Sequence, residues 1–130
     1  MSKLLSLGVA ALLALGASVG ATPAEAQDKF RIGAVVSLSG GFAGAAKDAM
    51  DGIEAWQRAR GLPGKQIEME TLDDETNPVS ASNAFRRLAS NPDISMIYVI
   101  APSSSVLAIK SLASEFKVPI ISAGAADAIG

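Results

Sequence analysis

Three consecutive serines, Ser103, Ser104 and Ser105, are the side chains in this sequence whose type and spacing best suit ligand binding. They follow a strongly apolar segment, residues 94–100, and open a stretch with helical periodicity. The first N–H groups of a helix have no partner within the helix, and together with hydroxyls they can bind a carboxylate without a basic side chain. Alternatively, one serine caps the helix and the other two face water. Capping explains one serine and leaves two unexplained, so we favour ligand contact.

Asp73, Asp74 and Glu75 form a second group that could carry chemistry, because neighbouring carboxylates bind metal ions or act in acid–base catalysis. These residues lie next to one another in a predicted turn, with no further metal ligand near them in the sequence. They also place negative charge just before a predicted helix, where the helix dipole favours it. The sequence therefore favours a structural role for the three acids, and we expect no catalytic residue and no metal site.

A glycine-rich segment, residues 39–44, follows a predicted strand and precedes a predicted helix. The dinucleotide fingerprint G-x-G-x-x-G would need glycine at position 39, or at both 42 and 45, where the chain has Ser39, Phe42 and Ala45. The phosphate-binding pattern G-x-x-x-x-G-K-[ST] does not occur, so we expect no nucleotide and no other cofactor. Residues 39–44 form either a flexible connection or one wall of a cleft, and the sequence favours neither.

The chain of 130 residues contains no cysteine and no histidine, which removes several kinds of active site. A thiol nucleophile, a disulfide, a histidine ligand for zinc and a Ser-His-Asp triad cannot be built from it. The pattern G-x-S-x-G of a serine hydrolase is also missing. The formal charge is −2, with both signs spread along the chain, so no nucleic-acid-binding surface is indicated. The composition favours a binding protein over an enzyme.

The first 26 residues have the features of a secretory signal peptide. Lys3 gives a short basic start, residues 4–19 are apolar and uncharged, and residues 24–26 (Ala-Glu-Ala) form a cleavage site. The alternative is a membrane anchor, but a spanning helix needs about 20 apolar residues. We therefore expect residues 1–26 to be removed, leaving a mature chain from Gln27 that is free in the periplasm. Without a cysteine there, that chain cannot carry a lipid.

Residues 27–130 alternate between strand and helix patterns, and we expect them to form part of one α/β domain. The segments rich in apolar and β-branched residues predict strands at 30–38, 67–72, 94–100 and 118–122. Helical periodicity is found between them, at 44–60, at 78–90 and from 103 onward. The order strand–helix–strand predicts a parallel sheet with helices on both faces.

Local signals place the ends of these elements and the position of two strands in the sheet. Asn77 followed by Pro78 is a typical helix start, and Gly61 suits the end of the first helix. Residues 67–72 alternate apolar and charged side chains, as in an edge strand with one wet face. Residues 94–100 are almost continuously apolar, as in a central parallel strand.

Each predicted helix has one apolar face. The positions on these faces are Ala46, Ala49, Met50, Ile53 and Trp56; Ala81, Ala84, Phe85 and Leu88; and Val106, Ile109, Leu112, Ala113 and Phe116. Ligands of open parallel sheets bind outside the carboxyl ends of the strands. Three segments rich in Ser, Gly and Ala reach that edge, at 37–44, 101–105 and 123–127. Small residues let backbone N–H groups approach a ligand closely there.

The mature segment resembles the branched-chain amino acid, or leucine-binding, type of periplasmic substrate-binding protein of ABC transporters. The resemblance runs from about residue 30 to residue 130 and is carried by four segments in order: IGAVVSLSGGFAG, LDDETNP, YVIAPSSSVLAIKSLA and EFKVPIISAGA. It implies a two-lobed protein of more than twice this length that clamps its ligand between lobes. This chain would then be the signal peptide and the N-terminal part of the first lobe, with strand order 2-1-3-4-5.

The resemblance also implies a function and a set of contacts. A monomeric protein of this type binds an amino acid or small organic acid and delivers it to an ABC permease in the inner membrane. A ligand-sensing protein on the same fold, signalling to a receptor, remains an alternative. The ligand's carboxylate and amino groups would be held by residues that match Ser103, Ser104 and Ser105, and Gly124, Ala125 and Ala126.

Two departures from the family pattern bear on the ligand. Ala101 stands before Pro102 where the family usually has glycine. Near Ala126 the family often has a Ser or Thr hydroxyl that helps to bind an ammonium group, and alanine cannot do so. A small carboxylate in general is therefore a better-supported ligand than an α-amino acid.

Overall fold

The computed structural model describes residues 28–61 and 65–123, and within them strands and helices alternate. The strands are β1 (Asp28–Val36), β2 (Lys65–Asp73), β3 (Ile94–Ile100) and β4 (Ile120–Ser122). The helices are α1 (Ala43–Ala59), α2 (Pro78–Ala89) and α3 (Ser103–Phe116). The predicted α/β class is confirmed, with element ends shifted by one or two residues.

All strand pairs in the described part of the chain are parallel, in the order β2-β1-β3-β4. This order agrees with the expected one as far as the described strands reach. β2 pairs with β1 over the full length of both strands and has no second neighbour among the described residues. The alternation of apolar and charged residues in β2 is thereby explained, because an edge strand is only half covered.

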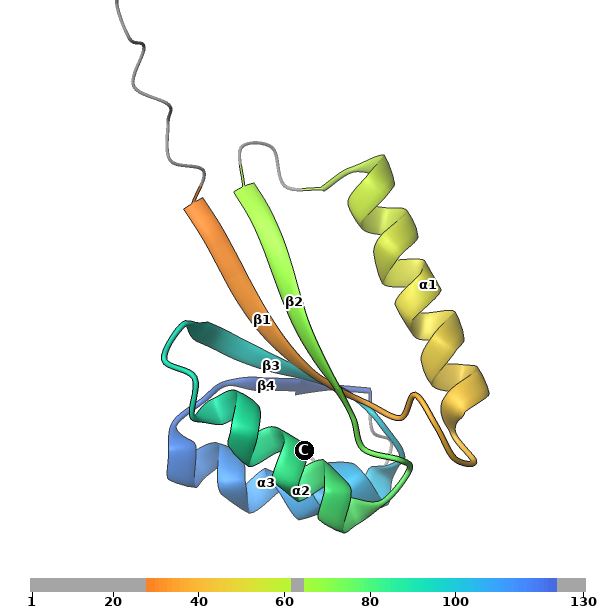
Figure 1. Cartoon of the computed structure of the whole chain (residues 1–130), viewed down its shortest axis with the longest axis vertical. Coiled ribbons are helices and arrows are strands. Elements are labelled where there is room, and N and C mark those ends of the chain that lie inside the picture. The colour runs from red at the N-terminus through yellow and green to blue at the C-terminus, as the bar shows by residue number, and fades with distance from the viewer. Residues whose placement is uncertain (1–27, 62–64, 124–130) are drawn as a thin grey trace, which may run out of the picture.

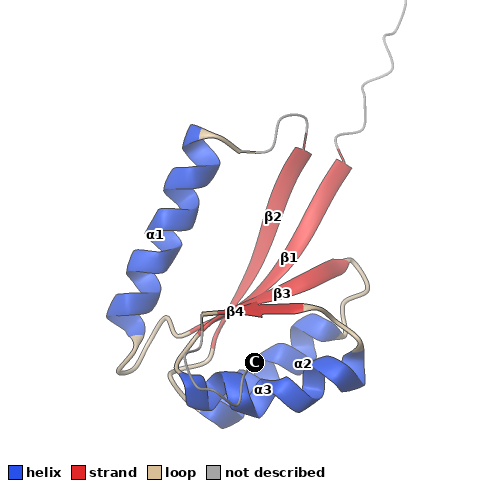
Figure 2. Ribbon diagram, turned by 180° about the vertical axis from the view of Figure 1, so that it is seen from behind, coloured by secondary structure: helices blue, strands red, loops and turns tan. Residues whose placement is uncertain are grey.

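Helices cover both faces of the sheet, as predicted (Figure 1). Figure 2 shows α2 and α3 side by side on one face and α1 alone on the other. The core on the α2–α3 side is the larger and has fully buried residues from β1, α2, β3 and α3; among them are Val35, Phe85, Leu88, Ile97, Val99, Val106 and Ile109. The core under α1 is smaller and is formed around Ala34, Val36, Ala46 and Ile100.

The local signals at the helix ends are confirmed. The side chain of Asn77 accepts hydrogen bonds from the N–H groups of Val79 and Ser80, and Pro78 occupies the first turn. Gly61 follows α1 with a φ of +50° and donates its N–H to the carbonyl of Trp56, which is the hydrogen bond that ends a helix at glycine. The side chain of Trp56 is 45% exposed, so the inner face of α1 is shorter than predicted.

At the amino ends of the strands, four charged residues form a surface network. Glu68 accepts from Lys29 at 2.9 Å and from Arg31 at 3.1 Å, and Arg31 also pairs with Asp93 at 3.4 Å. This network lies at the opposite end of the sheet from the predicted ligand edge. No helix in the described part of the chain is long and apolar enough to cross a membrane.

Candidate functional site

The carboxyl ends of β1, β2 and β3 are joined into one continuous edge. Beyond the last strand residues, the N–H of Asp74 donates to the carbonyl of Val36 at 3.1 Å. The N–H of Ser37 donates to the carbonyl of Ile100 at 3.0 Å. These hydrogen bonds place the segments that follow the three strands next to one another, which is where the sequence predicts a ligand.

The N-terminus of α3 opens onto this edge without a side-chain cap. Its N-cap residue is Pro102, whose carbonyl accepts from the N–H of Ser105 at 2.9 Å. The alternative that one of the serines caps the helix is therefore wrong. Ser104 is exposed, and its N–H has no acceptor within the described residues. A free N–H and an exposed hydroxyl at the positive end of a helix are suited to a carboxylate.

The three serines differ in their surroundings, although they are neighbours in the sequence. Ser103 is half-buried, Ser104 is exposed and Ser105 is fully buried. The hydroxyl of Ser105 has no hydrogen-bond partner among the described residues. Ser105 lies one helical turn before Ile109, a core residue, so it belongs to the inner face of α3. Of the three hydroxyl-bearing residues, only Ser103 and Ser104 are not fully buried at this edge.

The carboxylate of Asp73, the last residue of β2, binds the segment that follows β1. It accepts from the N–H groups of Leu38 at 2.9 Å and Ser39 at 3.3 Å, and from the hydroxyl of Ser39 at 2.7 Å. It also accepts from the N–H of Glu75 at 2.8 Å. Burial raises the pKa of Asp73, but the hydrogen bonds from Ser39, Glu75 and Leu38 outweigh burial and hold its pKa below the ordinary value.

Asp74 and Thr76 complete the connection between the two segments. Asp74 is fully buried and accepts from the hydroxyl of Ser37 at 2.5 Å and from the N–H of Thr76 at 2.9 Å. The hydroxyl of Thr76 donates to the carbonyl of Ser39 at 2.7 Å and accepts from the N–H of Phe42 at 3.2 Å. Asp73 and Asp74 thus have a structural role, as predicted. They fulfil it through hydrogen bonds to the neighbouring loop, whereas the sequence had suggested an interaction with the helix dipole.

Sequence reasoning missed this arrangement, because the partners lie more than 30 residues apart in the chain. The available signal was an Asp-Asp-x-Thr turn after one strand and a Ser-Leu-Ser-Gly segment after another. Such turns bind their own backbone two residues on, as Asp73 and Asp74 do here, and leave oxygens for a neighbour. Among the described residues, no group of three or more potential metal ligands is found.

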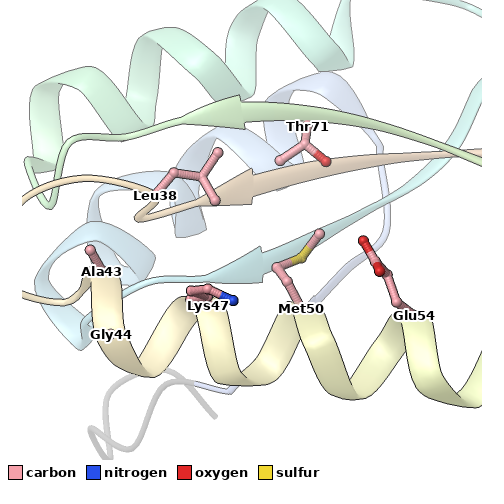
Figure 3. Close-up of a pocket in the computed structure, with 7 residues that line it drawn as sticks. All are labelled: Leu38, Ala43, Gly44, Lys47, Met50, Glu54 and Thr71. Carbon is pink, nitrogen blue, oxygen red and sulfur yellow. The ribbon is translucent and has the colours of Figure 1, made fainter.

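A cavity of about 560 Å³ lies between α1 and the sheet (Figure 3). Its lining is formed by Leu38, Ala43, Gly44, Lys47, Met50, Glu54 and Thr71. The charged groups at its rim are paired within α1, Lys47 with Asp51 at 2.7 Å and Glu54 with Arg58 at 2.9 Å. The cavity shares Leu38, Ala43 and Gly44 with the segment 37–44 of the predicted ligand edge, but its lining does not include the serines of α3.

Two sets of sequence predictions fall outside the described residues. Gly124, Ala125 and Ala126, the other implied ligand contacts, follow directly on the last described residue. The predicted signal peptide, residues 1–26, also lies outside them. The structure therefore describes one of the two predicted contact segments, the serines of α3.

Comparison with known proteins gives a family and several related structures. A family model described as periplasmic binding protein matches residues 29–130. A solute-binding protein of an ABC transporter from Rhodopseudomonas palustris BisB5, solved with 3,4-dihydroxybenzoic acid, is 28% identical with a TM-score of 0.72. The match covers 78% of this chain and 29% of that one. No curated protein matches the chain.

Two further structures share the fold at 24% identity. One is a leucine-binding protein from Thermotoga maritima, with a TM-score of 0.70 and coverage of 77% of this chain and 29% of the other. The second is a branched-chain amino acid transporter substrate-binding protein from Streptococcus pneumoniae, solved with isoleucine, with a TM-score of 0.68 and coverage of 78% and 31%. The chain therefore spans less than a third of the length of each of these relatives.

Proposed function

Because the chain belongs to the periplasmic binding protein family, we propose that it is the signal peptide and the opening part of the first lobe of an ABC importer's solute-binding component. The ligand is an amino acid or a similar small carboxylate. The protein binds it in the periplasm and delivers it to the permease without covalent chemistry. The family places such proteins in the periplasm or outside the cell, and its structural relatives are described as binding proteins, not enzymes.

The observation that carries this proposal is the uncapped N-terminus of α3 at the carboxyl edge of the sheet. The exposed hydroxyl of Ser104, its N–H without an acceptor among the described residues, and the half-buried Ser103 lie together there. A carboxylate oxygen accepts hydrogen bonds from these groups and interacts with the positive end of the helix dipole. The segment Gly124–Ala126 supplies the remaining contacts from this lobe in the proposal.

The absence of a basic side chain from this set has a consequence for selectivity. Hydroxyls and backbone N–H groups neutralise a carboxylate without a salt bridge, so the affinity depends on excluding water from the site. A second lobe closing over the ligand supplies that exclusion, and the relatives have the length for it. One relative was solved with an aromatic acid and another with an amino acid, so the carboxylate is the shared group.

The test is calorimetry on the full-length protein with isoleucine and with 3,4-dihydroxybenzoate as probes. For each probe, the matched compound is the primary amide, which keeps the shape and removes the carboxylate. We expect at least one acid to bind and its amide to bind at least about tenfold more weakly, since hydrogen bonds to a charged group contribute about 1.5–3 kcal/mol.

Single-residue variants test whether the carboxylate contacts the N-terminus of α3. Ser104→Ala is expected to weaken binding of the acid by about tenfold. Ser114→Ala removes an exposed hydroxyl at the other end of the same helix and is expected to leave the affinity unchanged. Binding of neither acid would count against the transport function. Equal affinities of the Ser104→Ala and Ser114→Ala variants would indicate that the carboxylate does not contact Ser104.

A further inference from the structure

The loop after β1, residues 37–42, makes most of its side-chain hydrogen bonds to the turn at the end of β2, residues 73–76. Six hydrogen bonds that involve side chains join the two segments. Backbone hydrogen bonds of the loop run from Ser37 to Ile100 at 3.0 Å, from Leu38 to Val36 at 2.9 Å and from Ala43 to Gly40 at 3.3 Å. The shape of the loop therefore depends on the turn.

We propose that Asp73 and Thr76 are positioning residues that hold the β1–α1 loop as a preformed wall of the ligand site, without touching the ligand themselves. This inference rests on the proposed function, because it concerns the same edge of the sheet. Of the two alternatives that the sequence left open for residues 39–44, a flexible connection or one wall of a cleft, the proposal takes the second.

The turn is a suitable support because it is itself anchored in the protein interior. Asp74 is fully buried, and it holds the N–H of Thr76 through its carboxylate and the N–H of Asn77 through its carbonyl, at 2.9 and 2.8 Å. Glu75 and Thr76 have φ values of +54° and +58°, which non-glycine residues adopt only at an energetic cost. These bonds offset that cost and stabilise the turn in this conformation.

Thr76 also fixes the start of α1. The N-cap residue of α1 is Phe42, which has no side-chain cap, and its own N–H donates to the hydroxyl of Thr76 at 3.2 Å. The same hydroxyl donates to the carbonyl of Ser39. One side chain therefore sets both the middle of the loop and the point where the helix begins.

A preformed β1–α1 loop is expected to affect the association rate of the ligand more than its dissociation rate. If the loop adopts its binding shape only part of the time, the apparent dissociation constant rises by the inverse of that fraction. The loss of affinity then appears as a slower association rate, because the bound complex keeps the same contacts and dissociates at the same rate. Removal of a direct ligand contact acts instead mainly on the dissociation rate.

The experiment uses the full-length protein and the variants Asp73→Ala, Thr76→Val and Thr76→Ser. The control is Asp93→Asn, which removes an exposed ion pair at the opposite end of the sheet. Hydrogen–deuterium exchange is measured on peptides covering residues 37–42, and stopped-flow binding is measured with isoleucine and 3,4-dihydroxybenzoate. Thr76→Ser keeps the hydroxyl and is expected to behave like the unchanged protein.

For Asp73→Ala and Thr76→Val we expect exchange in residues 37–42 to rise by at least about tenfold, with the control unchanged. Association is expected to slow by about tenfold, and dissociation to stay within about twofold. Unchanged exchange in both variants overturns the proposal. Faster dissociation with normal association also overturns it, because that result marks a direct contact. If neither probe binds the unchanged protein, that result counts against the transport function, and exchange alone decides whether the turn holds the loop.

Discussion

The close approach of Gly40 to the β2–α2 turn predicts a large effect of a single added methyl group. Gly40 has a φ of +80°, in the left-handed region that disfavours residues with a Cβ atom. A Cβ atom at this position would lie 2.7 Å from the carbonyl oxygen of Glu75 and 2.7 Å from the hydroxyl oxygen of Thr76. Gly40→Ala therefore requires the loop to move away from the turn.

Two contributions set the magnitude of the effect. The left-handed conformation costs a residue with a Cβ atom about 1–2 kcal/mol. Moving the loop also weakens the hydrogen bond between Thr76 and Ser39, which contributes about 1 kcal/mol. We expect Gly40→Ala to lower the free energy of unfolding by about 2–3 kcal/mol in total.

The neighbouring glycine provides the matched control. A Cβ atom at Gly41 would meet no atom within 4 Å, and Gly41 is not in the left-handed region. Gly41→Ala is expected to change the free energy of unfolding by less than about 1 kcal/mol and can raise it. Urea denaturation of the full-length protein, followed by circular dichroism, measures both variants. Equal midpoints for the two variants would refute the described packing of the loop against the turn.

Three further predictions concern the core, a helix cap and acid stability. Phe85 is fully buried, and its ring centroid lies 6.2 Å from that of Phe116 in an edge-to-face arrangement, so Phe85→Ala is expected to cost about 3–5 kcal/mol in urea denaturation, against under about 1 kcal/mol for the exposed Ser114→Ala. Asn77→Ala removes the cap of α2 and is expected to cost about 1 kcal/mol, which Asn77→Asp should largely restore. Because the folded-state pKa of Asp73 lies below its ordinary value of 3.8, its carboxylate stabilises the protein above that pH and loses this effect as the pH falls through the folded-state pKa. The stability difference between the unchanged protein and Asp73→Asn should therefore be constant at neutral pH and shrink in acid; a constant difference down to pH of about 2 would contradict the depressed pKa.

The sequence by itself was sufficient for the order and type of the elements. Strands and helices differ in hydrophobic period, and each period here is regular over a whole element. The caps at Asn77 and Gly61 depend on local chemistry within a few residues, so they were also predictable. The parallel sheet follows from the alternation of strands and helices, and the edge position of β2 from its charged residues.

The candidate site was predictable only in part. The position of the serines after a central strand was enough to place them at the carboxyl edge. Which of them reach that edge depends on how α3 is rotated against the sheet, and this rotation is set by packing of residues such as Val106 and Ile109. The burial of Ser105 and the exposure of Ser104 were therefore decided by the tertiary structure.

The hydrogen bonds between the β1–α1 loop and the β2–α2 turn were beyond the reach of the sequence pattern. Asp73 and Leu38 are 35 residues apart, and they meet only because β1 and β2 pair in register to their last residues, Val36 and Asp73. From the sequence alone, a carboxylate at the end of a strand is interpreted as a surface charge. Its hydrogen-bond partners can be identified only when the neighbouring strand is known. Local chemistry fixed each element of this protein, whereas the register of the sheet decided which polar groups became partners, because strand pairing joins segments that the chain keeps far apart.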